Sequence, residues 1–315
     1  MDALAGLLDG PRAKGAFLLR SIMDPPWSIR LEDRSPLTLI AMVRSEAWLK
    51  PDDGEAQLLR PGDVAIMRGP DPYTIGDALD TKPQAVIHPG QVCMTPSGEH
   101  LALSMDLGVR TWGDSLDGAA MMFTGTYEMD GEISQRLLKV LPPMLVIREE
   151  TWNCTILSLL AEEIVKDDPG QEAVLDRLLD LLLIAVLRTW FARPEAEPPT
   201  WYKAMSDPVV GRALRMIQNS PAQPWTVASL AAKTGVSRAA LARKFTELVG
   251  EPPMTFLTSW RLDLAADMLR EPGVTLEAVA RKVGYGSSFA LSTAYKRVHG
   301  VSPQFVRSRT TRVSS

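Results

Sequence analysis

Two stretches near the C-terminus combine a serine, small side chains and basic side chains in the same order. They read GVSRAALARKFTELVGEPP (235–253) and GYGSSFALSTAYKRVHGVSP (284–303). A guanidinium such as that of Arg243 can donate two hydrogen bonds to one planar edge, for example guanine O6 and N7. Small neighbouring side chains let a helix come close enough for this contact. These residue types therefore suit the reading of base pairs, if the fold presents them on one surface.

The two stretches belong to a repeated unit. Positions before the glycine turn match at an offset of 49 residues, and positions after it match at an offset of 50. Each unit predicts a short helix (227–234 and 276–283), a glycine turn and a second helix that a serine opens. That serine is Ser237 in the first unit and Ser287 or Ser288 in the second. The pattern is a helix-turn-helix outline.

Each second helix is expected to have an inward and an outward face, because positions i, i+4 and i+7 share one side. The inward set is Leu241, Phe245 and Leu248 in the first unit and Leu291, Tyr295 and Val298 in the second. The outward faces and the helix starts give the candidate DNA-binding residues Ser237, Arg238, Ala239, Ala242, Arg243, Thr246, Ser288, Phe289, Ser292, Thr293 and Lys296. The alternative is that Arg243 is an ordinary solvent-facing residue; the duplication favours the DNA interpretation.

Residues 254–270 separate the two units and have helical periodicity, with Leu257, Trp260, Leu264 and Met268 on one stripe. A helix of that length spans about 25 Å. It is expected to hold the two second helices in successive major-groove segments, which lie roughly 34 Å apart.

The charge of the chain is divided unevenly. The whole chain has a formal charge of −4, but residues 206–315 carry 15 Lys and Arg against 7 Asp and Glu, and residues 1–205 carry 19 against 31. A basic segment behind an acidic body favours a polyanion as the partner of the basic segment.

The rest of the chain predicts an α+β protein with three regions. Short apolar or alternating runs between 37 and 130 are typical of a β-barrel or sandwich, with Asp53-Gly54 as a hairpin turn. Residues 151–166 and 171–191 predict a leucine-rich helical hairpin, and 194–199 a linker. The predicted domains are 1–145 (cupin-like β domain, signal sensing), 146–205 (helical hairpin and linker) and 206–315 (DNA-binding domain with two helix-turn-helix units). The hairpin predicts either dimerisation or internal packing.

Over about 207–307 the chain resembles the AraC-type DNA-binding domain. The resemblance rests on both helix-turn-helix units, the linking helix around Arg261 and Ala265, and both closing Gly-x-x-Pro elements. LLRPGDVAIMRGPDPYTI (58–75) is similar to the subgroup with an N-terminal cupin domain. The resemblance implies a transcription regulator that binds promoter DNA and RNA polymerase, with an N-terminal domain that senses a signal, such as a small-molecule effector, or that mediates dimerisation. The family commonly has arginine where this chain has Thr293, which leaves base reading by the second helix open.

No metal and no other cofactor is expected. A cupin metal site needs several converging histidine and carboxylate ligands. The chain has no His-x-His, Tyr73 stands where the second cupin motif has its histidine, and only His88 and His100 remain in the domain. Cys93 and Cys154 lack a neighbouring basic residue and are expected to be inert buried thiols; the alternative is a regulator that responds to oxidants through them.

The remaining alternatives concern activity and location. A cupin enzyme with a helical appendage is the alternative function, but no Ser/His/Asp or Cys/His arrangement replaces the missing metal ligands, so no enzyme activity is expected. The longest apolar run, 178–191, is interrupted by Asp180 and Arg188 and is shorter than the roughly 20 residues that cross a membrane. No signal peptide is expected, which predicts a cytoplasmic protein.

Overall fold

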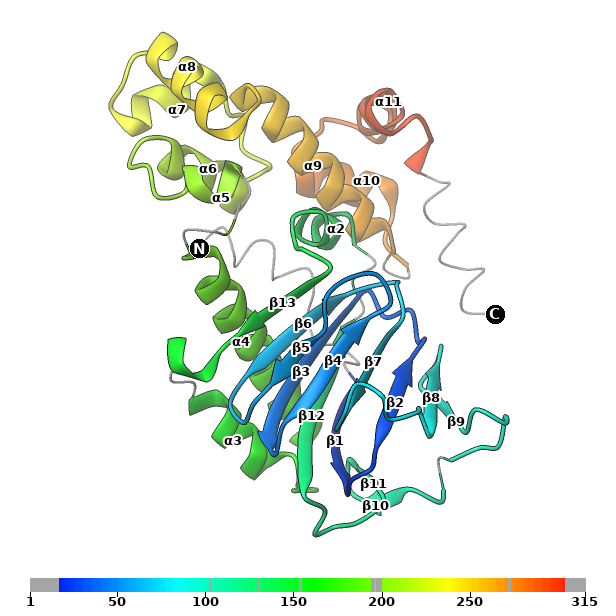
Figure 1. Cartoon of the computed structure of the whole chain (residues 1–315). Helices are drawn as coiled ribbons and strands as arrows, with labels where there is room; N and C mark the ends of the chain where they lie inside the picture. Colours follow the sequence, from blue (N-terminus) through cyan, green and yellow to red (C-terminus); the bar gives the residue numbers. More distant parts are fainter. Residues whose placement is uncertain are drawn as a thin grey trace. The chain divides into compact units, whose positions relative to one another are not determined.

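The computed structural model describes residues 17–101, 103–127, 129, 131–152, 155–193, 196, 200–270 and 273–303. The chain forms two compact units (Figure 1). Of the described residues, 17–101, 103–127, 129, 141–152, 155–193 and 196 form one unit, called the sheet unit below, and 131–140, 200–270 and 273–303 form the other, called the helical unit. The domain boundaries at 145 and 205 remain a prediction. The predicted α+β class with a β-rich N-terminal part and a helical C-terminal part is confirmed.

The sheet unit is built from two β-sheets. The order is β10-β11-β1-β12-β3-β6-β13 in the seven-stranded sheet and β5-β4-β7-β2-β8-β9 in the six-stranded sheet. The strands are β1 (Phe17–Met23), β2 (Ser28–Leu31), β3 (Leu37–Arg44), β4 (Ala47–Pro51), β5 (Gln57–Leu59), β6 (Val64–Arg68), β7 (Tyr73–Gly76), β8 (Ala85–His88), β9 (Val92–Met94), β10 (Asp106–Gly108), β11 (Thr111–Gly113), β12 (Ala120–Tyr127) and β13 (Met144–Ile147). One apolar cluster joins the facing sides of both sheets.

Local sequence explains the hairpin between β4 and β5. The two strands pair antiparallel, with Ala47 opposite Leu59. Gly54 in the connection has φ of +143°, a conformation that L side chains adopt only with strain. The predicted Asp53-Gly54 turn is confirmed.

The leucine-rich hairpin packs on the seven-stranded sheet. It consists of the short helix η1 (Glu149–Thr151), α3 (Thr155–Glu163) and α4 (Gln171–Phe191). The Tyr127 hydroxyl donates a 2.8 Å hydrogen bond to the Leu179 carbonyl, and a Cβ added to Gly125 would lie 2.9 Å from a Leu179 methyl. Glycine in β12 therefore lets α4 approach the sheet closely. This accounts for the buried leucines of α4 by internal packing.

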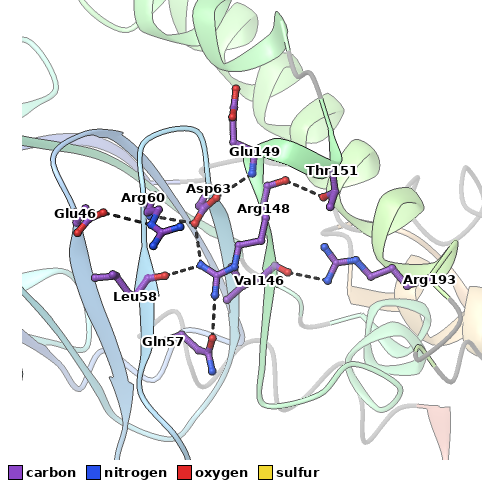
Figure 2. Close-up of polar contacts among 10 residues, drawn as sticks. All are labelled: Glu46, Gln57, Leu58, Arg60, Asp63, Val146, Arg148, Glu149, Thr151 and Arg193. Atoms are coloured by element: carbon purple, nitrogen blue, oxygen red, sulfur yellow. Dashed lines mark hydrogen bonds and ion pairs between the residues drawn. The ribbon is translucent and has the colours of Figure 1, made fainter.

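The Pro-Gly-Asp turn at 61–63 has a structural role (Figure 2). Asp63 is buried and accepts hydrogen bonds from the Arg60 amide at 3.0 Å, the Glu149 amide at 2.9 Å and the Arg148 guanidinium at 2.9 Å. Arg148 also donates to the Leu58 carbonyl and the Gln57 side chain. These bonds tie the β5–β6 turn to the segment that follows β13.

The helical unit contains α2 (Glu132–Leu138), α5 (Thr200–Ala204), α6 (Val210–Asn219), α7 (Val227–Thr234), α8 (Arg238–Val249), α9 (Pro253–Arg270), α10 (Leu276–Val283) and α11 (Ser288–His299). Figure 1 shows α9 running between the group α5–α8 and the pair α10–α11. Each group has its own apolar cluster, and α9 contributes residues to both. The two predicted helix-turn-helix units and the linking helix are present. The predicted linker 194–199 lies outside the described residues except for Ala196.

One inward residue was predicted wrongly. Val298 is 49% exposed, whereas Leu291 and Tyr295 are buried. The Tyr295 ring instead stacks on His299, with 4.3 Å between the ring centroids. Leu291 and Tyr295 pack in one apolar cluster with α9 and α10, and the half-buried His299 continues that side of α11 at i+8. In α8 the matching i+8 position, Val249, is buried.

Candidate nucleic-acid interface

The first unit presents α8 through a tight turn. Helix α7 ends at Gly235, which has φ of +76° and supplies the left-handed turn that most side chains avoid. Ser237 then caps α8, since its hydroxyl accepts a 3.2 Å hydrogen bond from the Ala240 amide. Leu241 and Phe245 face inward and are fully buried. The opposite side of α8 is therefore left on the surface.

The candidate residues of the first unit lie on that surface. Ser237, Arg238, Ala239, Arg243 and Thr246 are exposed, and Ala242 is half-buried. The described residues provide no hydrogen-bond or ion-pair partner for Arg243. Its neighbour Lys244 forms a 2.6 Å ion pair with Asp207. The Arg243 guanidinium is thus available for an external ligand, whereas the Lys244 ammonium is engaged.

The second unit has the same frame. Gly284 closes α10 with φ of +87°, and the Ser287 hydroxyl accepts a 3.2 Å hydrogen bond from the Ala290 amide. Ser287, and not Ser288, is therefore the N-cap. The Ser288 amide donates to Glu277 at 3.0 Å, which holds the pKa of that carboxyl below its ordinary value.

The outward surface of α11 differs in chemistry from that of α8. Phe289, Thr293 and Lys296 are exposed, and Ser288 and Ser292 are half-buried. Phe289 is 80% exposed. The Thr293 hydroxyl donates to the Phe289 carbonyl at 2.9 Å, so it is already engaged within the helix. The second helix offers an apolar ring and a lysine where the first offers an arginine.

Further exposed cations lie beside the predicted set. Arg297 is one turn after Thr293 on α11, and Arg281 and Lys282 are at the end of α10. None of these three cations belongs to the predicted set of DNA-binding residues. Two sequence features indicate them: the i+4 spacing of Arg297 from Thr293, and the basic pair next to the second glycine turn.

Arg261 on α9 holds the segments of both units together. It donates to the carbonyls of Pro221 at 2.7 Å and Gln223 at 2.8 Å, before α7, and its guanidinium lies 6.0 Å from the Tyr285 ring in the second turn. Burial lowers the pKa of Arg261 from its ordinary value. At Gly284 an added Cβ would lie 2.7 Å from the backbone of Ala222, so glycine permits this close approach. The two helix-turn-helix units are therefore fixed on α9 by a specific side chain.

The sheet unit encloses a separate cavity of about 250 Å³ between its two sheets. The apolar wall comes mainly from the six-stranded sheet and includes Ile29, Leu31, Ile75, Ile87 and Cys93. The other wall, on β1 and β12, carries the hydroxyls of Ser21, Thr124 and Thr126. Asp33 and Gln91, which share a 3.2 Å hydrogen bond, lie at the cavity in loops. No basic side chain is among the described residues that line it.

The residues considered for metal binding or redox chemistry are Tyr73, His88, His100, Cys93 and Cys154. Tyr73 is buried, whereas His88 and His100 are not, and in the described part of the chain no three His, Cys, Asp or Glu residues form a metal cluster. Burial raises the pKa of Cys93 to about 11, so little of the reactive thiolate is present near pH 7. Cys154 lies outside the described residues.

Comparisons with known proteins agree with this architecture. A cupin family model matches residues 2–192, and a helix-turn-helix domain model matches residues 230–309. A putative AraC-like transcription regulator of Streptomyces antibioticus is 30% identical over 96% of this chain and 97% of its own length. The chain belongs to the AraC family of transcription regulators.

Two further regulators are similar to all or to part of this chain. The regulator AlkR of Acinetobacter baylyi is 26% identical over 98% of this chain and 99% of its own length. The DNA-binding domain of AdpA, solved in complex with a target DNA, is 29% identical, covers 33% of this chain and 93% of that chain, and has a TM-score of 0.31.

As an AraC-family member, this protein is a helix-turn-helix DNA-binding regulator with a cupin-like N-terminal part. None of the helices in the described residues is long and apolar enough to cross a membrane.

Proposed function

We propose that this AraC-family regulator binds promoter DNA sequence-specifically by placing α8 and α11 in two successive major-groove segments. The observation that carries the proposal is the duplication: two capped helices of equal length expose small, basic or aromatic side chains and are both fixed on α9. The 18 residues of α9 span about 27 Å, which is about four-fifths of the roughly 34 Å of one turn of duplex DNA.

The two helices α8 and α11 suit the recognition of different features of the DNA. Arg243, flanked by Ala239 and Ala242, suits a bidentate contact with guanine. Phe289 suits apolar contact with a thymine methyl group, and Lys296 suits a phosphate. We infer that the first segment is read for a guanine and the second for thymine and backbone shape.

The test is a selection of bound duplexes from a random-sequence library by the full chain. The selected duplexes are expected to share two short motifs about 10–10.5 base pairs apart. Arg243→Ala is expected to lose about 1–3 kcal/mol of discrimination at one guanine. Arg44→Ala, which removes one exposed arginine from β3, is the control for net charge and should bind like the unchanged protein. Equal binding by Arg243→Ala at every salt concentration would show that the assigned reading face is wrong.

We infer that the cavity in the sheet unit binds the effector. The volume exceeds the roughly 150 Å³ of an engineered cavity that accepts benzene. An apolar wall, three hydroxyls, one carboxylate and no described cation suit an uncharged molecule with an apolar body and one hydroxyl group. A carboxylate ligand would meet Asp33 without a compensating positive charge.

The remaining parts of the proposal concern partners and location. Val174 and Leu181 lie seven residues apart on α4, share one side of it and are 43% and 50% exposed. With Leu159 on α3 they support a homodimer through the hairpin. We propose that the protein acts in the cytoplasm, at promoter DNA and together with RNA polymerase, and that it is a regulator and not an enzyme.

A further inference from the structure

Helix α2 belongs to the helical unit although the chain places it between two strands of the sheet unit. In sequence it follows β12 and precedes β13, which both lie in the seven-stranded sheet. Its packing partner in the helical unit is α9, the helix between the two DNA-binding units. Ile133 of α2 is 3% exposed and is part of the apolar cluster of the first unit. A segment between two sheet strands therefore completes the core around α5–α9.

Arg136 is the main polar contact of α2 with α9. Its guanidinium bonds to the Asp263 carboxylate and to the Ser259 hydroxyl. It also lies 6.0 Å from the ring of Phe256 and 5.9 Å from that of Trp260. These four residues share one side of α9 between 256 and 263, so a single arginine contacts about two turns of the linking helix.

The contacts of α2 reach the second unit as well. Asp263 lies 3.9 Å from the Nε2 of His299, the last residue of α11. Glu132, the first residue of α2, lies 3.9 Å from Arg270, the last residue of α9. The Asp267 carboxylate accepts hydrogen bonds from the Glu132 amide at 2.6 Å and the Ile133 amide at 3.3 Å, which are unpaired at the start of a helix. Thus α2 contacts the first unit through Ile133 and is linked to the second unit through α9, where Asp263 lies near both Arg136 of α2 and His299 of α11.

We propose that α2 is a brace: docked on α9, it fixes the two helix-turn-helix units relative to each other, with Arg136 as the positioning residue. The inference rests on the proposed two-segment DNA binding and adds a residue outside the DNA-facing surface on which that binding depends. Fixing both units before binding lowers the entropy lost when the second unit joins the first on one duplex. The brace therefore raises the affinity for a duplex with two motifs and leaves the affinity for one motif unchanged.

The contacts also suit a brace that can be released. Most of them join charged or polar groups that water solvates well when they separate, as is typical of interfaces that open. Helix α2 begins five residues after the end of β12, and β12 provides Met122, Thr124 and Thr126 to the cavity wall. The strand that would contact an effector is thus directly joined in sequence to the brace.

The experiment compares two duplexes and three proteins. The first duplex is one selected by the unchanged full chain, and the second has the motif for α11 scrambled. The variants are Arg136→Met, which keeps an unbranched side chain without the charge, and Arg44→Met on β3, which makes the same charge change at an exposed position. Circular dichroism confirms that each variant is folded.

Arg136→Met is expected to weaken binding to the two-motif duplex by about tenfold or more, because Asp263 loses its buried partner and docking becomes unfavourable. Binding to the one-motif duplex should stay within about twofold, and Arg44→Met should change neither. In the unchanged protein, amide hydrogen exchange of 132–138 should slow when the two-motif duplex binds.

Two results would overturn the brace. Equal losses on both duplexes would mean that Arg136 serves general folding, and no loss on either would mean that α2 does not orient the units. If the unchanged protein selects no two-motif duplex, the proposed DNA reading fails, and that outcome is distinct because it is seen before any variant is made.

Discussion

Arg136 on α2 forms an ion pair with Asp263 on α9, although 127 residues of sequence separate them. Asp263 is 7% exposed, and burial raises the pKa of its carboxyl although the guanidinium acts in the opposite direction. Removing one partner from such a pair costs about 3–5 kcal/mol, since a buried charge is left uncompensated. The docking of α2 therefore depends strongly on one arginine.

The docking of α2 on α9 is expected to depend on pH largely through the carboxyl of Asp267. Burial raises the pKa of its carboxyl to about 6, against the hydrogen bonds from the Glu132 and Ile133 amides and the charge of Arg270, which lower it, while Asp263 raises it further. A raised pKa means that the packed state binds the proton more tightly than the open state. Packing is thus most stable below the ordinary carboxyl pKa and loses stability as the pH rises to about 6.

Asp267→Asn tests the predicted direction of this pH dependence, because an amide is neutral and keeps an oxygen acceptor. Thermal unfolding should show a higher Tm for the variant relative to the unchanged protein at pH 7.5, and a smaller difference at pH 5. A difference that grows as the pH falls would contradict the assignment. Asp71→Asn, in an exposed loop of the sheet unit, is the matched control.

The α11 surface predicts two separable effects on DNA binding. Phe289→Ala should reduce the preference for thymine at one position without changing the salt dependence, since a phenyl group releases no counterions. Lys296→Ala should weaken binding to all sequences alike and reduce the slope of log affinity against log salt by about 1. Titrations of selected and thymine-substituted duplexes at several salt concentrations measure both effects. Identical behaviour of the two variants would show that Phe289 does not contact a base.

The cavity predicts selectivity for an uncharged ligand. Isothermal titration of the full chain should detect binding of 4-propylphenol and none of 4-propylbenzoate, because Asp33 opposes a second negative charge. Thr124→Met, which extends a side chain into the cavity, should abolish the binding; Thr155→Met, at an exposed position on α3, should not. Preference for the benzoate would reject the assigned ligand chemistry while leaving DNA binding untouched.

The Asp63 network predicts a large stability effect. Arg148→Met leaves a buried carboxylate without its guanidinium and should lower the free energy of unfolding of the sheet unit by about 3–5 kcal/mol. Arg60→Met is the control, because the Arg60 side chain is largely exposed and its ion pair with Glu46 should contribute about 0–1 kcal/mol. Urea unfolding of both variants measures the two free energies of unfolding. Similar losses in the two variants would show that the Arg148–Asp63 contact does not stabilise the sheet unit more than an exposed ion pair does.

The exposed apolar side chains of the hairpin predict self-association. Sedimentation at micromolar concentration should show a dimer for the unchanged protein and a monomer for Leu181→Glu, because a charge in the interface lacks a partner. Leu103→Glu, at an exposed loop position, should remain dimeric. A monomeric unchanged protein would exclude the hairpin as a dimer interface.

The sequence by itself determined the local elements. The glycine turns, serine caps and apolar periodicity of 227–299 gave both helix-turn-helix units and the linking helix, because caps and periodicity act within a few residues. The same holds for the Asp53-Gly54 hairpin and for the outward position of Arg243.

Only the tertiary structure decided how distant segments combine. Residues 131–140 join the helical unit through Ile133 and Arg136, the half-buried His299 and not Val298 continues the inward side of α11, and the cavity takes its walls from strands far apart in sequence. Such contacts depend on packing angles and on which strands are neighbours. Periodicity states which face of an element is apolar, and packing alone selects the partner that covers it.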